Sequence, residues 1–178
     1  MQFASPDALE RARRVKLMLF DVDGVLTDGK LWFTPSGEEL KSFHSFDGLG
    51  LQLLARSGVR TALLTGRTSP AVSLRAAQLG VEYVLQGVED KLARYEALID
   101  SLGLSTAQTG FMGDDLVDVP VLRRCGFACT VHEAPEEVRK RVHYVAATPA
   151  GAGAAREVCE YIMRAQGTFA RVLEGYLK

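Results

Sequence analysis

Two aspartates separated by one residue stand at the end of an apolar run of the chain. The run covers residues 15–20 and leads directly into Asp21 and Asp23, a pattern typical of a buried strand that ends in two carboxylates. In open α/β sheets ligands bind at the carboxyl ends of the strands, so both acids are expected at that edge. Two like charges this close repel each other unless a cation neutralises them or one of them holds a proton. Both conditions suit phosphoryl transfer.

Three later segments place further polar groups at the predicted ends of neighbouring strands. Thr65-Gly66-Arg67 offers a hydroxyl and turn N–H groups that can hold a phosphate oxygen. Lys91 opens a predicted helix and can bring a positive charge to an anion. The third segment is a second group of carboxylates, formed by Asp114, Asp115 and Asp118. Each segment alone is compatible with an ordinary turn or helix start, but their order on successive strands predicts one shared site.

Helix and strand patterns alternate along most of the chain. We predict helices over 6–14 (capped by Ser5), 48–57, 70–79, 90–102, 116–123, 135–140 and 153–166, the last with room to extend to residue 176. Strands are predicted over 15–20, 59–64, 83–85, 108–112, 127–131 and, at an edge of the sheet, 143–145. A hairpin is predicted from 30–34 and 39–43. This order indicates an α/β fold, a Rossmann-like three-layer sandwich with a mostly parallel sheet, in a single domain over residues 1–178.

Composition and charge limit the classes of partner. Hydrophobic residues make up 47% and charged residues 24% of the 178 residues, and the formal net charge is −1, so no face for nucleic acid or an anionic membrane is expected. The predicted partner is a small molecule. The sequence contains no run of about 18 apolar residues and its first residues are charged where a signal peptide would be apolar, so we expect a cytoplasmic protein. Cys125, Cys129 and Cys159 favour buried free thiols over a metal or redox site.

The four polar segments together resemble the motif set of the haloacid dehalogenase superfamily of phosphohydrolases. The matching residues are DVDGVLTD from Asp21, LLTGR from Leu63, the lone Lys91 and GDDLVD from Gly113, within a resemblance that spans about residues 16–160. The segments GEELKSFHSFDGLG, LQG, GDDLVDVPVL and GAGAAREVCE are also similar to the family of 3-deoxy-D-manno-octulosonate 8-phosphate phosphatases. The resemblance implies hydrolysis of that sugar-acid phosphate in the lipopolysaccharide core synthesis of Gram-negative bacteria.

The resemblance assigns a chemical role to each residue of the predicted site. Asp21 is implied to attack phosphorus and form an aspartyl-phosphate, which divides one difficult displacement into two easier ones. Asp23 is implied to protonate the departing sugar oxygen and then to activate water. Thr65 and Lys91 are implied to bind the transferred phosphoryl oxygens, and Lys91 also offsets the charge of Asp21.

The implied cofactor is Mg²⁺, which favours carboxylate, carbonyl, water and phosphate oxygens. Its expected ligands are Asp21, the main-chain carbonyl of Asp23, and Asp114. Asp115 and Asp118 are expected to support these ligands without touching the ion. From the residues alone, Asp118 is also compatible with a solvated acid in the first turn of a helix.

The rest of the substrate carries a carboxylate and hydroxyls, and arginine is a natural partner for the carboxylate. By resemblance, Arg67 and Arg75 contribute, and the substrate-binding set is completed by Asp23, Gly66, Lys91 and the hairpin-base residues His44, Ser45, Phe46, Asp47 and Gly48. Arg75 could also be a solvated helix residue, and a lone histidine such as His44 is often structural. Some family members have arginine where this chain has Gln52, and arginine or histidine where it has Ala152. These departures concern the choice of substrate and leave hydrolysis unaffected.

The chain is expected to be capless, because the intervals from Asp28 to Thr65 and from Thr65 to Lys91 are too short for a cap domain. A lone subunit would then leave its site open to water. Either a macromolecular substrate or a neighbouring subunit could cover it, and the near-neutral charge favours the neighbour. Leu31, Trp32 and Phe33 on the hairpin are candidates for that contact, although they could also pack on their own domain. The resemblance implies a homotetramer.

Two other functions are compatible with the same motifs. A phosphatase for another nonulosonate, such as deaminoneuraminate 9-phosphate, would share every catalytic residue and differ only at the hairpin base and tail. A non-catalytic module or phospho-acceptor domain could also share the scaffold. The intact pair Asp21 and Asp23 favours catalysis, because an acceptor needs the nucleophile but has no use for an acid two residues later.

Overall fold

The structure is a computed structural model that describes residues 3–177. Its main sheet has the strand order β1-β9-β8-β7-β2-β5-β6. The strands are β1 (Phe3–Ala4), β2 (Leu17–Phe20), β5 (Arg60–Leu64), β6 (Tyr83–Leu85), β7 (Thr109–Met112), β8 (Phe127–Val131) and β9 (Tyr144–Ala146). Strands β2 and β5 to β9 run parallel, and β1 pairs antiparallel with β9. The predicted α/β sandwich with a mostly parallel sheet is confirmed.

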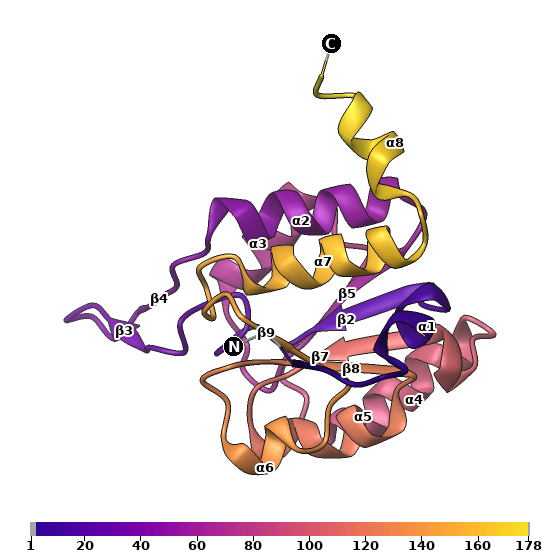
Figure 1. The fold of residues 1–178 in the computed structure, drawn as a ribbon. Coiled ribbons are helices and arrows are strands. Elements are labelled where there is room, and N and C mark those ends of the chain that lie inside the picture. Colours follow the sequence, from indigo (N-terminus) through magenta and orange to yellow (C-terminus); the bar gives the residue numbers. More distant parts are fainter. Residues whose placement is uncertain (1–2, 178) are drawn as a thin grey trace.

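Helices cover both faces of this sheet (Figure 1). One layer holds α2 (Ser45–Arg56), α3 (Pro70–Leu79) and α7 (Ala154–Ala165), and the other holds α4 (Lys91–Ser101), α5 (Val119–Arg124) and α6 (Glu136–Arg139). The short helix α1 (Ala8–Arg13) contacts α7, and α8 (Phe169–Glu174) projects from the body beyond α7. Two 3-10 turns, Thr106–Gln108 and Leu116–Asp118, precede β7 and α5. Among the described residues, no helix is long and apolar enough to cross a membrane.

The centre of the sheet aligns the strand ends that carry the predicted site. All four residues of β2 are buried, and β2 is paired on both sides, with Phe20 opposite Leu63 of β5 and Met112 of β7. A strand buried on both faces reads as a continuous apolar run, which is the pattern of residues 17–20. Because the three strands end at the same level, the residues that follow them meet at one edge.

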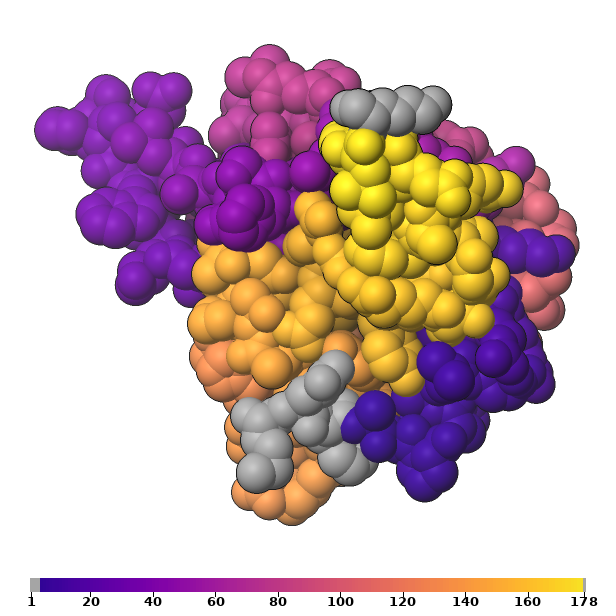
Figure 2. All heavy atoms as spheres, turned by 45° about the horizontal axis from the view of Figure 1, so that its top comes forward, coloured from indigo at the N-terminus to yellow at the C-terminus, as the bar shows by residue number. Residues whose placement is uncertain are grey.

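The predicted hairpin forms a separate two-stranded sheet that projects from the body as an arm (Figures 1 and 2). Its strands are β3 (Trp32–Phe33) and β4 (Glu39–Leu40), with Trp32 opposite Leu40 and Phe33 opposite Glu39. Trp32 and Phe33 are each 58% exposed. The alternative that these two aromatic side chains pack on their own domain is therefore wrong for the chain as described.

Two predictions near the N-terminus need correction. The strand β1 was not expected, and it covers β9, so the predicted edge strand lies one place inside the sheet. Two residues at a chain end give too short a pattern for periodicity to detect. Ser5 does not cap the first helix: its hydroxyl donates to Asp7 Oδ1 at 2.7 Å, and Asp7 occupies the cap position.

Three helix boundaries also differ from prediction. Helix α2 begins at Ser45 instead of residue 48, because His44 Nδ1 accepts the N–H of Phe46 at 3.2 Å and caps the helix. The predicted helix 116–123 starts as a 3-10 turn before α5. The tail helix is divided in two at Gly167, whose φ of +70° ends α7.

The cysteine prediction is confirmed. Cys125, Cys129 and Cys159 are all free and buried. Burial raises the pKa of the Cys125 thiol to about 12, so this thiol stays protonated and inert near neutral pH.

Candidate active site

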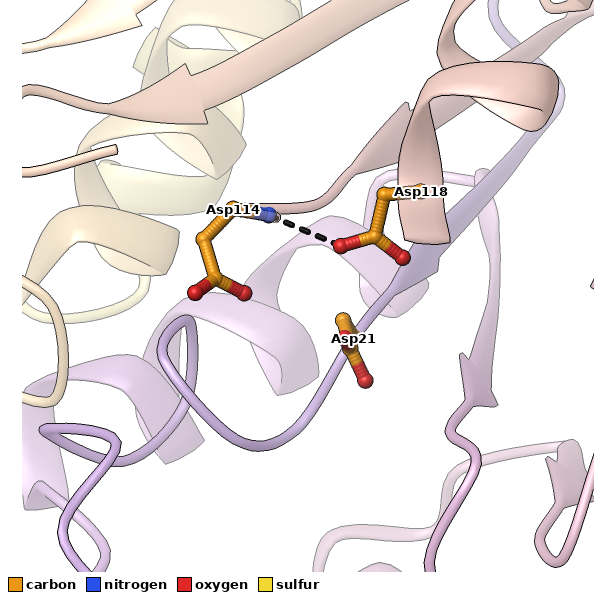
Figure 3. A group of neighbouring side chains, drawn as sticks. All are labelled: Asp21, Asp114 and Asp118. Atoms are coloured by element: carbon orange, nitrogen blue, oxygen red, sulfur yellow. Dashed lines mark hydrogen bonds between the residues drawn. The ribbon is translucent and has the colours of Figure 1, made fainter. Parts of the chain in front are cut away.

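Three aspartates from two strand ends and a turn lie beside one another (Figure 3). Asp21 follows β2, Asp114 follows β7, and Asp118 ends the 3-10 turn before α5. One carboxylate oxygen from each lies within 4.8 Å of the others. Asp21 and Asp118 are buried, and Asp114 is half-buried. The topology therefore joins Asp21 to two acids that stand more than ninety residues later in the sequence.

Lys91, the first residue of α4, supplies the positive charge of this cluster. Its Nζ donates to Asp21 Oδ2 at 2.7 Å and to Asp118 Oδ1 at 2.6 Å. Burial acts to lower the pKa of Lys91, but the charges of Asp21 and Asp118 outweigh it and hold that pKa above its usual value. The ammonium group therefore stays charged next to Asp21.

The Asp118 carboxylate connects Lys91 to the loop that carries Asp114. Its Oδ2 accepts the main-chain N–H groups of Asp114 at 3.0 Å and Asp115 at 3.2 Å, while its Oδ1 accepts from Lys91. Both oxygens are thus occupied and the residue is fully buried, so the alternative of a solvated acid is wrong. These contacts fit a supporting role behind Asp114. Asp115 differs: it is exposed, and its Oδ1 accepts the N–H of Leu116 at 2.7 Å.

The electrostatics of Asp21 and Asp114 favour a bound cation. Burial, reinforced by the charge of Asp118 and opposed by Lys91, raises the pKa of Asp21 to about 7. Burial and the charges of Asp21 and Asp118 likewise raise the pKa of Asp114 to about 7. Within residues 3–177, Asp114 Oδ1 is buried and accepts no hydrogen bond. A divalent cation would satisfy this oxygen and favour the ionised form of both acids.

The backbone near Asp114 is shaped to admit that carboxylate. Gly24 has φ +83°, and a Cβ at this position would lie 2.0 Å from Asp114 Oδ2. Only glycine adopts this conformation without strain and leaves the space free. The loop after β2 and the loop after β7 can therefore approach closely.

Asp23 is held by a residue that the sequence analysis did not identify. Its Oδ1 accepts from Lys41 Nζ, and the Lys41 ammonium also pairs with Glu39 Oε1 at 2.9 Å. Glu39 in turn accepts from Arg67 Nε at 3.1 Å. Glu39 and Lys41 are two residues apart in an extended segment, so both side chains point to the same side. That period-two spacing of opposite charges was the available signal.

A cavity of about 340 Å³ opens over these groups. It brings together the predicted catalytic and phosphate-binding residues, which are Asp21, Asp23, Thr65, Gly66, Arg67, Lys91 and Asp114, with Asp115 and Val117 at its wall. Thr65 is fixed by its main chain, because its N–H donates to Leu85 at 2.9 Å and its carbonyl accepts from Val88 at 3.2 Å. Positive, negative and hydroxyl groups thus surround one space of the size of a small ligand.

The chain is similar to known phosphatases over nearly its whole length. A family model described as haloacid dehalogenase-like hydrolase matches residues 81–158. The 3-deoxy-D-manno-octulosonate 8-phosphate phosphatase KdsC of Yersinia pestis is 39% identical over 160 residues, which are 90% of this chain and 86% of that protein. The chain belongs to the 3-deoxy-D-manno-octulosonate 8-phosphate phosphatase family. It is therefore a phosphomonoester hydrolase, and the non-catalytic alternative is set aside.

Solved structures agree with membership of the octulosonate phosphatase family. A probable YrbI family phosphatase from Pseudomonas syringae pv. phaseolica is 44% identical, with a TM-score of 0.96 over 98% of this chain and 99% of that chain. The phosphatase from Moraxella catarrhalis, solved with magnesium, phosphate and the sugar acid, is 38% identical, with a TM-score of 0.94 over 96% and 98% of the two chains. The fold is thus that of this phosphatase family.

The remaining residues of the predicted substrate-binding set lie outside the cavity that Asp21 lines. His44, Asp47, Gly48 and Arg75 line a separate small pocket between α2 and α3, and Ser45 and Phe46 are exposed at the start of α2. Arg75 packs on Gly48, where a Cβ would lie 2.3 Å from its guanidinium. Within one chain these residues do not join Asp21, and their contact with substrate stays a prediction.

Asp47 has a structural position in this chain. Its Oδ2 accepts the N–H of Gly153 at 3.1 Å and its Oδ1 accepts the N–H of Arg156 at 2.9 Å, so it closes the start of α7 from α2. Such bonds satisfy helix N–H groups that would otherwise lack a partner. Each of its two oxygens thus accepts a main-chain N–H of the α7 start, and its predicted contact with substrate stays a prediction.

We expect Asp47→Ala to lower the free energy of unfolding by about 1–3 kcal/mol, because it leaves two helix N–H groups without an acceptor. Chemical denaturation of the variant beside Asp100→Ala, an exposed acid on α4, measures this. A KM rise with unchanged stability would instead indicate a substrate contact and contradict the structural role.

Proposed function

We propose that this chain hydrolyses 3-deoxy-D-manno-octulosonate 8-phosphate to the free sugar acid and phosphate, in the cytoplasm, as a step of lipopolysaccharide core synthesis. The observation that carries the proposal is the buried carboxylate of Asp21, set between the Lys91 ammonium and Asp114 at the sheet edge. The substrate follows from the names of the relatives, which match most of the chain.

In the first step, a carboxylate oxygen of Asp21 forms a bond to phosphorus while the bond from phosphorus to the sugar oxygen breaks. Asp23 donates its proton to that oxygen, which leaves as a hydroxyl. The product on the enzyme is an aspartyl-phosphate. Asp23 lines the same cavity as Asp21, which supports its role as the proton donor.

In the second step, water replaces Asp21 on phosphorus. Asp23, now ionised, takes a proton from the water as its oxygen bonds to phosphorus, and the bond between phosphorus and Asp21 breaks. Phosphate leaves, Asp21 is again a carboxylate and Asp23 is again protonated. Two difficult tasks, attack and leaving-group protonation, are thus divided between two neighbouring carboxyl groups.

Asp21, Asp114 and the main-chain carbonyl of Asp23 would hold Mg²⁺, and the unpartnered Asp114 Oδ1 supports this assignment. When bound, Mg²⁺ supplies positive charge to the carboxylates and to the phosphoryl oxygens. Asp118 fixes the loop of Asp114 through two N–H groups. Asp115, exposed at the cavity wall, has a weaker claim to a supporting role.

The other polar groups of the cavity are assigned to the phosphoryl group and the sugar acid. Thr65, the N–H of Gly66 and Lys91 would bind the phosphoryl oxygens, since a hydroxyl, an amide and an ammonium are all donors. Arg67 lies at the cavity wall and is nearly half exposed, so it is available to the carboxylate of the sugar acid. Its pairing with Glu39 fixes its position in the free enzyme.

A second copy of the chain would complete the site. The capless fold leaves the cavity of Asp21 open, and the arm carries exposed Leu31, Trp32, Phe33 and Leu40. Exposed apolar residues on a projecting arm favour contact between protein chains. We therefore propose a homotetramer in which a neighbour covers each cavity and brings residues such as His44 and Arg75 toward substrate.

The test of the substrate is a comparison of two sugar-acid phosphates. We expect the eight-carbon octulosonate ester to have a kcat/KM at least about tenfold above that of deaminoneuraminate 9-phosphate, because extra polar groups without partners cost affinity. Phosphate release over a range of concentrations of each ester measures it. A higher kcat/KM for the nine-carbon ester would assign the chain to that substrate, and no release from either would overturn the proposal.

A further inference from the structure

Four alternating charges connect the arm to the cavity. Asp23 contacts Lys41, Lys41 contacts Glu39, and Glu39 contacts Arg67. Arg67 Nε lies 4.0 Å from Asp23 Oδ2, so the four charged groups form a closed ring of contacts. Glu39 lies on β4 and Lys41 directly follows it, so two of the four charges belong to the base of the arm.

The environment of Lys41 is unusual for a lysine on a projecting hairpin. Its side chain is only 2% exposed, whereas Lys30 at the other side of the arm is 70% exposed. A buried ammonium is costly unless its charge is matched, and here the carboxylates of Asp23 and Glu39 match it. Removal of Lys41 would leave those two carboxylates close together without their shared cation.

Lys41 contacts Asp23 on one oxygen only. Asp23 and Arg67 line the cavity, whereas Lys41 is not among its lining residues. Within the described chain, Asp23 Oδ2 is buried and has no hydrogen-bond partner. The contact at Oδ1 therefore fixes the orientation of the carboxyl group without engaging its second oxygen.

We propose that Lys41 is a positioning residue for Asp23, anchored by Glu39, and that through it the arm sets the orientation of the group that protonates the leaving oxygen. This inference rests on the proposed function, because it gives a task to Lys41 only if Asp23 is the proton donor. The arm then has a role inside its own active site, in addition to any contact with a neighbouring subunit. Rigid orientation matters since proton transfer needs hydrogen-bond distance to the leaving oxygen.

The test uses aryl phosphates, which lack the sugar and so remove effects on sugar binding. For such esters kcat/KM reports the step up to loss of the aryl group, where Asp23 is the proton donor. An acid matters for phenyl phosphate, whose leaving group is poor, and little for p-nitrophenyl phosphate. We expect Lys41→Met to lower kcat/KM about 100-fold for phenyl phosphate and less than about tenfold for p-nitrophenyl phosphate.

Control variants make the result specific. Lys30→Met, an exposed lysine on the same arm, should keep both values within about twofold. Lys41→Arg should recover most of the phenyl phosphate activity, because it restores a cation beside Asp23. Lys41→Gln carries the same expectation as Lys41→Met and keeps a polar side chain in the buried position, in case the methionine variant fails to fold.

Asp23→Asn serves as the reference for loss of the acid. The loss of kcat/KM in Asp23→Asn should be much larger for phenyl phosphate than for p-nitrophenyl phosphate. If it is, but the folded Lys41 variants lose activity equally on both esters, the positioning role is overturned and the proposed function stands. If Asp23→Asn itself shows no such dependence, the proton-donor role fails, and the inference about Lys41 fails with it.

Discussion

Replacing Asp21 with asparagine is expected to lower kcat for the octulosonate ester by at least about 10⁴-fold. The amide has nearly the same shape as the carboxylate, but it cannot attack phosphorus and carries no charge for Lys91 to neutralise. Loss of a nucleophile in other hydrolases has effects of this size or larger. Phosphate release from the purified variant, compared with the wild type at saturating substrate, measures the loss.

The matched control is Asp100→Asn, the same chemical change at an exposed position on α4. It should keep kcat within about twofold. Mass spectrometry of the wild type quenched in acid during turnover should also detect one added phosphoryl group, and the group should be absent from Asp21→Asn. Full activity of Asp21→Asn would contradict both the nucleophile assignment and the covalent intermediate.

Removal of the divalent cation is expected to have the second largest effect, a loss of about 10³-fold or more in kcat/KM. Without a cation, Lys91 offsets Asp21 and Asp118, and Asp114 completes a group of three carboxylates whose oxygens lie within 4.8 Å of one another. A metal ion at such a position contributes several kcal/mol to the stabilisation of phosphoryl charge, and each 1.36 kcal/mol is a factor of ten in rate. Dialysis against a chelator, followed by titration with Mg²⁺, measures the loss and the recovery.

Two variants make the metal assignment specific. Asp114→Asn should raise the Mg²⁺ concentration needed for half-maximal activity by at least about tenfold, whereas Asp100→Asn should leave it unchanged. Activity that persists unaltered in the chelated protein would exclude a metal-dependent mechanism. An Asp114→Asn variant with the wild-type Mg²⁺ requirement would instead move the ion away from Asp114.

The dependence on pH follows from the raised pKa values of Asp21 and Asp114, from 3.8 in the unfolded chain to about 7 in the folded one. Between these values the metal-free folded state binds more protons than the unfolded state, so its stability falls as the pH rises from about 4 to 7. Mg²⁺ competes with those protons. The rise in melting temperature caused by Mg²⁺ should therefore be larger at pH 8 than at pH 5.5, and the reverse order would contradict the assignment.

The proposed site residues were predictable because Asp21, Thr65 and Asp114 follow strands and Lys91 opens a helix. Leu17–Phe20 is apolar throughout and leads into Asp21, and Arg60–Leu64 leads in the same way into Thr65. Parallel strands place such ends along one edge, so the neighbourhood of Asp21, Thr65, Lys91 and Asp114 followed from their order alone. The structure confirmed that convergence in a single cavity.

Other features of the structure could not be predicted from a local sequence pattern. The two-residue strand β1 and the division of the tail at Gly167 depend on short segments and a single backbone conformation. The structural contacts of Asp47 depend on the packing of α2 against α7, more than a hundred residues later in the chain. Periodicity cannot detect a contact between segments so far apart.

By itself, the amino-acid sequence determined the sheet, the edge that carries the site and the chemical types of the groups gathered there, because strand and helix periods and strand-end residues are local properties. Only the tertiary structure decided which charges pair. It committed both oxygens of Asp118 to supporting contacts, left Asp114 Oδ1 without a partner among the described residues and buried Lys41 against Asp23. Burial and distance set the strength of electrostatic interactions, and both exist only after the chain has folded.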